Sequence, residues 1–194
     1  MNLPNKLTSS RMIMAFAFLA ALLSGIPYGR TIAFFIFVMA GVTDALDGYY
    51  ARKRNLLTDF GKLMDPLADK ILISAAFISF VQWPEDTQVQ AWMAIVIVAR
   101  EFAVTGVRLL AASKGVIIGA HRWGRNKMVS QSLTAGIILA FLSLKEHVPA
   151  SVEDAINYPV SIALNVLLYT TVTITAATGI VFLLKHRELM VSDV

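Results

Sequence analysis

The chain has 194 residues, of which 57% are hydrophobic and 15% are charged, with a formal net charge of +4. This composition excludes an ordinary soluble domain, because too few polar residues are present to cover a water-facing surface. The absence of cysteine excludes disulfides and thiolate metal sites, and the three histidines are too far apart to favour a zinc enzyme. The basic residues lie at the ends of apolar blocks, which favours lipid headgroups and phosphate substrates over nucleic acid.

The apolar residues fall into six blocks, and about 20 residues suffice to cross the hydrocarbon of a bilayer. Residues 1–10 are polar and predict a short interfacial segment, not a cleaved signal peptide. The predicted spans cover residues 11–24, 31–51, 59–82, 89–113, 126–144 and 159–184, and residues 145–158 predict a second interfacial stretch. Since no internal repeat is found, we expect one all-α integral membrane domain over residues 1–194, with about six transmembrane helices.

The basic residues also predict how these spans are oriented. An even number of spans places both termini on one side, and most lysines and arginines outside the spans fall on that side. The loops on the other side carry two basic residues, Arg30 and Lys145, and five acidic ones, Glu85, Asp86, Glu146, Glu153 and Asp154. The positive-inside rule therefore predicts that both termini are cytoplasmic.

Four aspartates lie where the second and third predicted spans approach this cytoplasmic side. Asp44 and Asp47 are three residues apart and Asp65 and Asp69 are four apart, so each pair shares one face of a helix. If the two helices face each other, the carboxylates converge and need a counter-charge. Mg²⁺, Mn²⁺ and Ca²⁺ prefer oxygen ligands, so the pattern predicts a divalent-cation site. Solvated loop acids are the plainer interpretation, but they need no fixed spacing.

Small residues and an arginine accompany the aspartates. Gly48, Ala51 and Gly61 leave room beside the carboxylates, and glycine allows a ligand to approach the backbone closely. Arg52 carries a planar cation that matches phosphate oxygens. The whole stretch therefore predicts a cytoplasmic pocket for a phosphate-rich substrate.

A second group of charges lies on the fourth and fifth predicted spans. Arg100 and Arg108 are eight residues apart and so lie near one helix face, two turns apart. Arg100 lies inside an apolar segment and needs a partner, which is either Glu101 or an anionic second substrate. Near the start of the fifth span, Arg122 is interpreted as ordinary flanking charge, whereas for Arg125 and Lys127 both interpretations stay open.

The aspartate stretch resembles the signature of the CDP-alcohol phosphatidyltransferase family. The match covers Asp44, Asp47, Gly48, Ala51, Arg52, Gly61, Asp65 and Asp69. The resemblance implies a six-helix membrane enzyme, homodimeric and located in a bacterial cytoplasmic membrane. It would use one or two Mg²⁺ or Mn²⁺ ions and displace CMP from a CDP-linked lipid with an alcohol.

Residues 2–11, 100–108 and 124–128 resemble the members of this family whose acceptor is sn-glycerol 3-phosphate, although Arg125 and Met128 stand where those members have Lys and Thr. The resemblance implies that the acceptor phosphate binds Arg100, Arg108, Arg125 and Lys127. It implies that CDP-diacylglycerol binds Asp44, Asp47, Gly48, Ala51, Arg52, Gly61 and Asp65. The product would be phosphatidylglycerophosphate. Beyond residue 128 the chain is apolar and shows no specific motif.

The same resemblance assigns the metal to Asp44, Asp47, Asp65 and Asp69, and we take Asp69 as the candidate general base. Two alternatives stay open. One is a family member with another acceptor, such as inositol phosphate, serine or phosphatidylglycerol. The other is a divalent-ion transporter, which is less favoured because the acids cluster at the cytoplasmic end and no repeated halves are visible.

Overall fold

The structure is a computed structural model that describes the backbone of residues 3–54, 59–116, 118 and 122–188. Side chains are described within these ranges except at residues 3–9, 11, 44–54, 59–69, 122–126, 150 and 154. Every regular element in these ranges is a helix. In order they are α1 (Leu3–Leu23), α2 (Gly29–Arg54), α3 (Asp59–Phe80), the four-residue α4 (Pro84–Thr87), α5 (Ala91–Ser113), α6 (Arg122–Lys145) and α7 (Ala150–Lys185).

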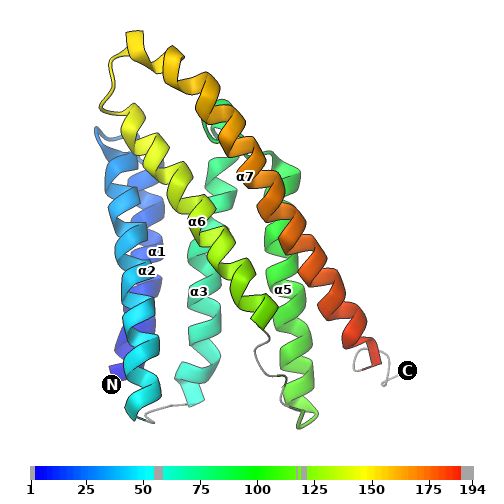
Figure 1. The fold of residues 1–194 in the computed structure, drawn as a ribbon. Coiled ribbons are helices and arrows are strands. Elements are labelled where there is room, and N and C mark those ends of the chain that lie inside the picture. Colours follow the sequence, from blue (N-terminus) through cyan, green and yellow to red (C-terminus); the bar gives the residue numbers. More distant parts are fainter. Residues whose placement is uncertain (1–2, 55–58, 117, 119–121, 189–194) are drawn as a thin grey trace.

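The long helices run alternately up and down one bundle (Figure 1). At one end, here named the motif end, α2 ends and α3 begins; α1 also begins there and α5 ends there. The connections α1–α2, α3–α4–α5 and α6–α7 lie at the opposite end. α3 packs against α1, α5 and α6, and α7 packs against α5 and α6. α3, together with the direct packing of α2 on α6, connects the α1–α2 pair to the helices that carry the basic residues.

Small residues allow the helices to approach each other closely. Ala33 and Ala40 on α2, Ala76 on α3 and Ala135 on α6 are almost fully buried. Larger core side chains fill the remaining space, as where the ring centroids of Phe77 and Phe80 lie 5.9 Å apart. Close packing through small residues is typical of helices in membranes, where lipid tails give little hydrophobic drive for association.

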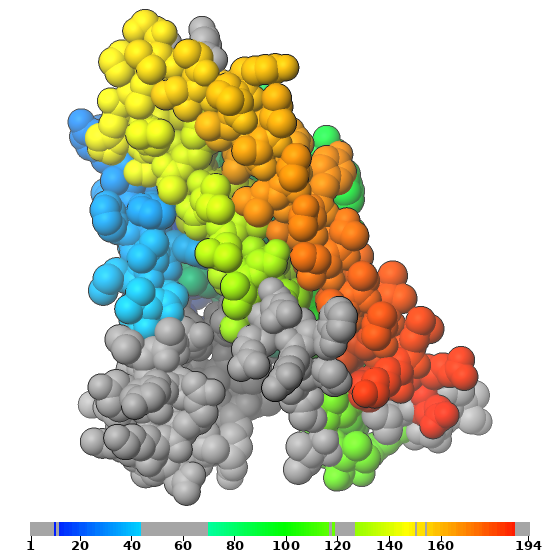
Figure 2. Space-filling model, viewed as in Figure 1, coloured from blue at the N-terminus to red at the C-terminus, as the bar shows by residue number. Residues whose placement is uncertain are grey.

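The outer surface of the bundle is strongly apolar. Two described stretches, Lys127–Lys145 and Ala155–Lys185, are long and apolar enough to cross a membrane by length and composition. Shorter apolar helical stretches cover Met12–Leu23, Gly29–Thr43 and Lys70–Phe80. α6 and α7 cover one face of the molecule side by side (Figure 2). α7 also exposes large apolar side chains, including Val166 and Val181. Such a surface suits contact with lipid.

Two helix boundaries differ from the sequence-based prediction. α1 starts at Leu3 and runs unbroken into the first predicted span, so residues 3–10 belong to the same helix as that span. α7 starts at Ala150 and continues through Pro159 for 36 residues, so most of the predicted interfacial stretch belongs to this helix. Its first turns are inclined to the rest (Figure 1), as expected where proline removes a backbone donor. At about 1.5 Å per residue, α7 is longer than the ~30 Å of bilayer hydrocarbon.

The carboxylate of Glu146 ties the α6–α7 connection to the start of α2. It accepts hydrogen bonds from the backbone N–H groups of Arg30, at 3.0 Å, and Thr31, at 2.9 Å. The Thr31 hydroxyl donates to the same carboxylate at 2.8 Å. Because the first N–H groups of a helix lack partners within the helix, an acidic side chain there is stabilising.

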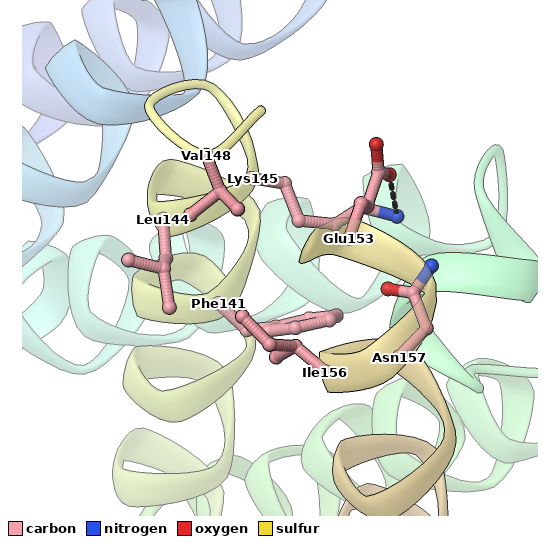
Figure 3. A pocket seen from close by; sticks show the side chains of 7 residues that line it. All are labelled: Phe141, Leu144, Lys145, Val148, Glu153, Ile156 and Asn157. Carbon is pink, nitrogen blue, oxygen red and sulfur yellow. Dashed lines mark ion pairs between the residues drawn. The ribbon is translucent and has the colours of Figure 1, made fainter. Parts of the chain in front are cut away.

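A second polar group holds the opposite end together around Lys145. Its ammonium lies 2.5 Å from the Asp86 carboxylate of α4 and 2.6 Å from the Glu153 carboxylate of α7. Figure 3 shows the Lys145–Glu153 pair beside a small hollow between α6 and α7, where Phe141 and Ile156 supply apolar lining. This hollow lies at the end of the bundle away from the aspartate motif, so it is not a candidate for the predicted chemistry.

Candidate active site

The aspartate motif is divided between the last turns of α2 and the first turns of α3. α2 carries Asp44 and Asp47, and α3 carries Asp65 and Asp69, so both predicted pairs lie on helical backbone. Both helix ends lie at the motif end of the bundle (Figure 1). Five backbone steps separate Arg54 from Asp59, which limits these ends to about 18 Å apart.

The side chains of all eight motif residues lie outside the described part of the structure, so their contacts stay predictions. Among the side chains that are described, no group of three or more His, Asp or Glu residues could hold a metal ion. The donor set itself fits a divalent ion: the two carboxylate pairs, on helix ends joined by one short connection, offer hard oxygen ligands. The residues present therefore suit a divalent metal of the Mg²⁺ or Mn²⁺ kind.

A buried ion pair joins α5 to α6. The ammonium of Lys127 contacts the carboxylate of Glu101, and these residues are 3% and 5% exposed. Lys127 lies in the second turn of α6, close to where that helix starts, and Glu101 lies near the middle of α5. Since an unpaired charge in such surroundings costs several kcal/mol, the two residues depend on each other.

Arg100 shares the Glu101 carboxylate but is less completely paired. One terminal nitrogen of its guanidinium lies 3.5 Å from Glu101 Oε1, and 12% of its side chain is exposed. Its Nε is buried and has no hydrogen-bond partner among the described residues. Two cations thus contact one carboxylate, and the Nε of Arg100 is a donor that an anion could use. The sequence suggests two partners for Arg100, namely Glu101 or an external anion. This geometry is compatible with both.

Arg108 lies two turns further along α5, toward the motif end. It is exposed, and its guanidinium carbon lies 5.7 Å from the centroid of the Phe182 ring on α7. A cation over an aromatic face is attracted by the ring quadrupole. The side chain of Arg125, the fourth predicted acceptor ligand, lies outside the described residues. The structure thus brings Arg100 and Lys127 to the same carboxylate and places Arg108 on the same helix as Arg100.

The sequence analysis did not predict that α7 forms hydrogen bonds with α6, because this part of the chain has the pattern of an apolar helix without a motif. Its Thr171 hydroxyl lies 2.8 Å from those of Ser130 and Thr134 on α6, and the Gln131 amide donates to Thr175 at 3.1 Å. These hydrogen bonds lie along the α6–α7 interface, in the turns of α6 that follow Lys127. The available signal was the four-residue spacing of Thr171 and Thr175 within an apolar helix.

The described residues form a helical bundle with an apolar exterior and an aspartate motif at one end, which is consistent with a membrane enzyme. The family model described as CDP-alcohol phosphatidyltransferase matches residues 1–181. The chain belongs to this family, whose members are membrane enzymes that generally use divalent metal ions.

Relatives with more specific names cover most of the chain. A protein of Bacillus subtilis (strain 168) is 42% identical over 150 residues, which are 71% of this chain and 76% of that protein. A protein of Rickettsia bellii is 33% identical over 138 residues, 71% of this chain and 75% of the relative. Both are named CDP-diacylglycerol–glycerol-3-phosphate 3-phosphatidyltransferase. A protein named probable phosphatidylglycerophosphate synthase, from Mycobacterium tuberculosis, is 37% identical over 157 residues, 79% of this chain and 73% of the relative.

Proposed function

We propose that this chain transfers the phosphatidyl group of CDP-diacylglycerol to sn-glycerol 3-phosphate, giving phosphatidylglycerophosphate and CMP in phospholipid biosynthesis. Membership of the CDP-alcohol phosphatidyltransferase family supports the reaction class. The names of relatives at 33–42% identity support this donor and this acceptor. The structural observation that carries the acceptor assignment is the pair of cations, Arg100 and Lys127, gathered around Glu101.

The acceptor differs from a plain alcohol by its phosphate group. Arg100 offers a buried donor that finds no partner among the described residues, and Lys127 adds a second cation beside the same carboxylate. Arg108 lies on the same helix, nearer the motif end. We assign the acceptor phosphate to Arg100, Arg108, Lys127 and Arg125, because guanidinium and ammonium groups pair strongly with phosphate oxygens.

We assign the nucleotide end of the lipid donor to the α2 and α3 ends. Asp44, Asp47, Asp65 and Asp69 would hold one or two divalent ions, Mg²⁺ or Mn²⁺. A bound ion supplies Lewis-acid chemistry that stabilises charge on the diphosphate and on departing CMP. Gly48, Ala51 and Gly61 would leave space for the cytidine, and Arg52 would contact a nucleotide phosphate.

Direct displacement accounts for the reaction with the groups that this chain offers. The primary hydroxyl oxygen of the acceptor attacks the β-phosphorus of the donor, and the bond from this phosphorus to the oxygen of CMP breaks. Asp69 accepts the hydroxyl proton as general base. α3 carries Asp69 and packs against both α5 and α6, so it connects the predicted donor site to the helices of the acceptor cations. Holding both substrates in one site supplies much of the acceleration.

We further propose that the six long helices cross the membrane, with both termini and the motif end in the cytoplasm, and that the enzyme is a homodimer. The apolar exterior and the concentration of basic residues support this orientation. The chain has no cysteine, so single cysteines can report topology. In intact cells, Ser24→Cys should react with an impermeant maleimide, whereas Ser113→Cys should react only after permeabilisation; the reverse result would contradict the orientation.

Incorporation of radiolabelled sn-glycerol 3-phosphate into the lipid fraction tests the proposed reaction. Purified protein in detergent, with CDP-diacylglycerol and Mg²⁺, should produce a labelled lipid that carries two phosphates. A parallel sample with Asp44→Asn and Asp65→Asn should produce none. Label that stays entirely in the aqueous phase with folded wild-type protein would contradict the proposal.

A further inference from the structure

The C-terminal half of α7 lies directly against the two arginines of α5. Gly179 faces the aliphatic part of Arg100, and the ring of Phe182 faces the guanidinium of Arg108. Since residues 179 and 182 are three apart, they lie on one face of α7. One helix surface therefore contacts both arginines, which come from positions two turns apart on the neighbouring helix.

The contact at Gly179 leaves no room for a larger residue. A Cβ atom at this position would lie 2.7 Å from Cγ of Arg100 and 3.7 Å from its Nε. Cγ is close to the backbone and cannot swing away as the tip of a side chain can, so the whole arginine stem would shift. Glycine inside a helix lowers stability relative to alanine. Its presence here is explained by the space that Arg100 occupies.

The contact at Phe182 acts on the charged group itself. The Arg108 guanidinium carbon lies 5.7 Å from the ring centroid, within the range of a cation–π interaction. Phe182 is half-buried, and its ring centroid lies 4.4 Å from that of His186. The ring is therefore held between its own helix and α5, where it restricts the otherwise exposed Arg108.

We propose that Gly179 and Phe182 are positioning residues that aim Arg100 and Arg108 at the phosphate of the acceptor substrate. This inference rests on the proposed function, in which these arginines bind sn-glycerol 3-phosphate. Neither α7 residue touches the substrate. They act by fixing the direction of the arginine side chains, so their replacement changes acceptor binding while the donor site on α2 and α3 stays intact.

Glycine-to-alanine substitutions test the first contact with a matched control. Gly179→Ala should raise KM for sn-glycerol 3-phosphate about tenfold or more, because small misplacements of binding groups are costly, and should leave KM for CDP-diacylglycerol within about twofold. Gly136→Ala is the control: it lies inside α6, and its added Cβ would meet Phe37 only at an ordinary 4.0 Å. Equal effects of the two substitutions, or equal changes in both KM values, would overturn the proposal for Gly179.

A double-mutant cycle tests the second contact. Phe182→Leu should raise KM for sn-glycerol 3-phosphate by about two- to fivefold, the range expected for an exposed cation–π contact. Phe182→Tyr keeps the aromatic face and should restore the wild-type value. In an Arg108→Gln background, Phe182→Leu should have no further effect, whereas independent, multiplying effects would overturn the proposal for Phe182.

Single arginine variants, compared with the two α7 variants, distinguish a wrong role for α7 from a wrong acceptor site. If Arg108→Gln raises KM for the acceptor but neither α7 substitution does, the acceptor site stands and the role of α7 is overturned. If Arg100→Gln and Arg108→Gln both leave KM for the acceptor unchanged, the acceptor site itself is wrong and the inference falls with it.

Discussion

The ammonium of Lys127 on α6 forms a buried ion pair with the carboxylate of Glu101 on α5, and Arg100 approaches the same carboxylate at 3.5 Å. Glu101 is thus an internal counter-ion for two cations that we assign to an anionic substrate. A buried ion pair contributes little net stability compared with apolar residues, yet loss of one partner is costly. This asymmetry suggests that the charges are present for binding, not to stabilise the fold.

The first prediction therefore concerns Lys127. Lys127→Met removes the nearer cation and leaves Glu101 with the more distant Arg100, so it should lower the free energy of unfolding by about 3 kcal/mol. Adding Glu101→Leu should recover little of this stability, because it leaves Arg100 without its carboxylate partner, and the double variant should also lack the low KM for sn-glycerol 3-phosphate. Thermal unfolding in detergent and steady-state kinetics measure the two effects. A double variant with wild-type acceptor KM would exclude Lys127 from the acceptor site.

The second prediction concerns Asp69. Asp69→Asn removes the proposed proton acceptor but keeps the size and polarity of the side chain, so kcat should fall about 10²- to 10⁴-fold. Binding of CDP-diacylglycerol, measured by competition with a labelled nucleotide, should persist. Fully retained turnover would remove Asp69 from the role of base and leave it, at most, as a metal ligand.

The third prediction concerns divalent metal. Treatment with a chelator should abolish transfer, because the four motif aspartates would repel each other and the diphosphate without a bound cation. Addition of Mg²⁺ or Mn²⁺ should restore it. Activity that survives exhaustive chelation would contradict the metal assignment of the aspartates, although not the assignment of the acceptor cations.

The fourth prediction concerns pH and the Glu146 carboxylate. Burial by itself raises the pKa of Glu146, but hydrogen bonds from the Thr31 hydroxyl and the Arg30 and Thr31 amides outweigh it and hold this pKa below its ordinary value of 4.5. A carboxyl whose pKa is lower in the folded state stabilises the fold above pH 4.5 and loses this contribution as the pH falls through the folded-state value.

Comparison with Glu146→Gln isolates that contribution. The substitution should lower the free energy of unfolding by about 1 kcal/mol at pH 7, as for loss of a helix N-terminal cap. Between pH 5 and pH 3, the unfolding temperature of the wild type should fall more than that of the variant. Parallel pH curves for the two proteins would show that the carboxylate does not act as a charged cap.

The sequence was sufficient for the family and for the long helices, because apolar block length and fixed motif spacing are local signals. It was wrong about where the last helix begins, since residues 150–158 are helical despite their polarity and despite Pro159. Tertiary pairing could not be read from the sequence. The sequence offered Glu101 as one of two possible partners for Arg100, but it gave no sign that Lys127 on another helix is the nearer partner of this carboxylate. The contact between Gly179 and Arg100 likewise joins two helices that are far apart in the chain, so the sequence does not show it.

CMP release by the purified protein tests the central claim most directly, with CDP-diacylglycerol and Mg²⁺ supplied and the acceptor varied among sn-glycerol 3-phosphate, inositol phosphate, serine and none. We predict release that depends on sn-glycerol 3-phosphate and disappears with a chelator. Release with another acceptor alone would keep the reaction class and contradict the assignment of Arg100, Arg108, Arg125 and Lys127. No release with any acceptor, from folded protein, would contradict the proposed activity and reopen the ion-transport alternative.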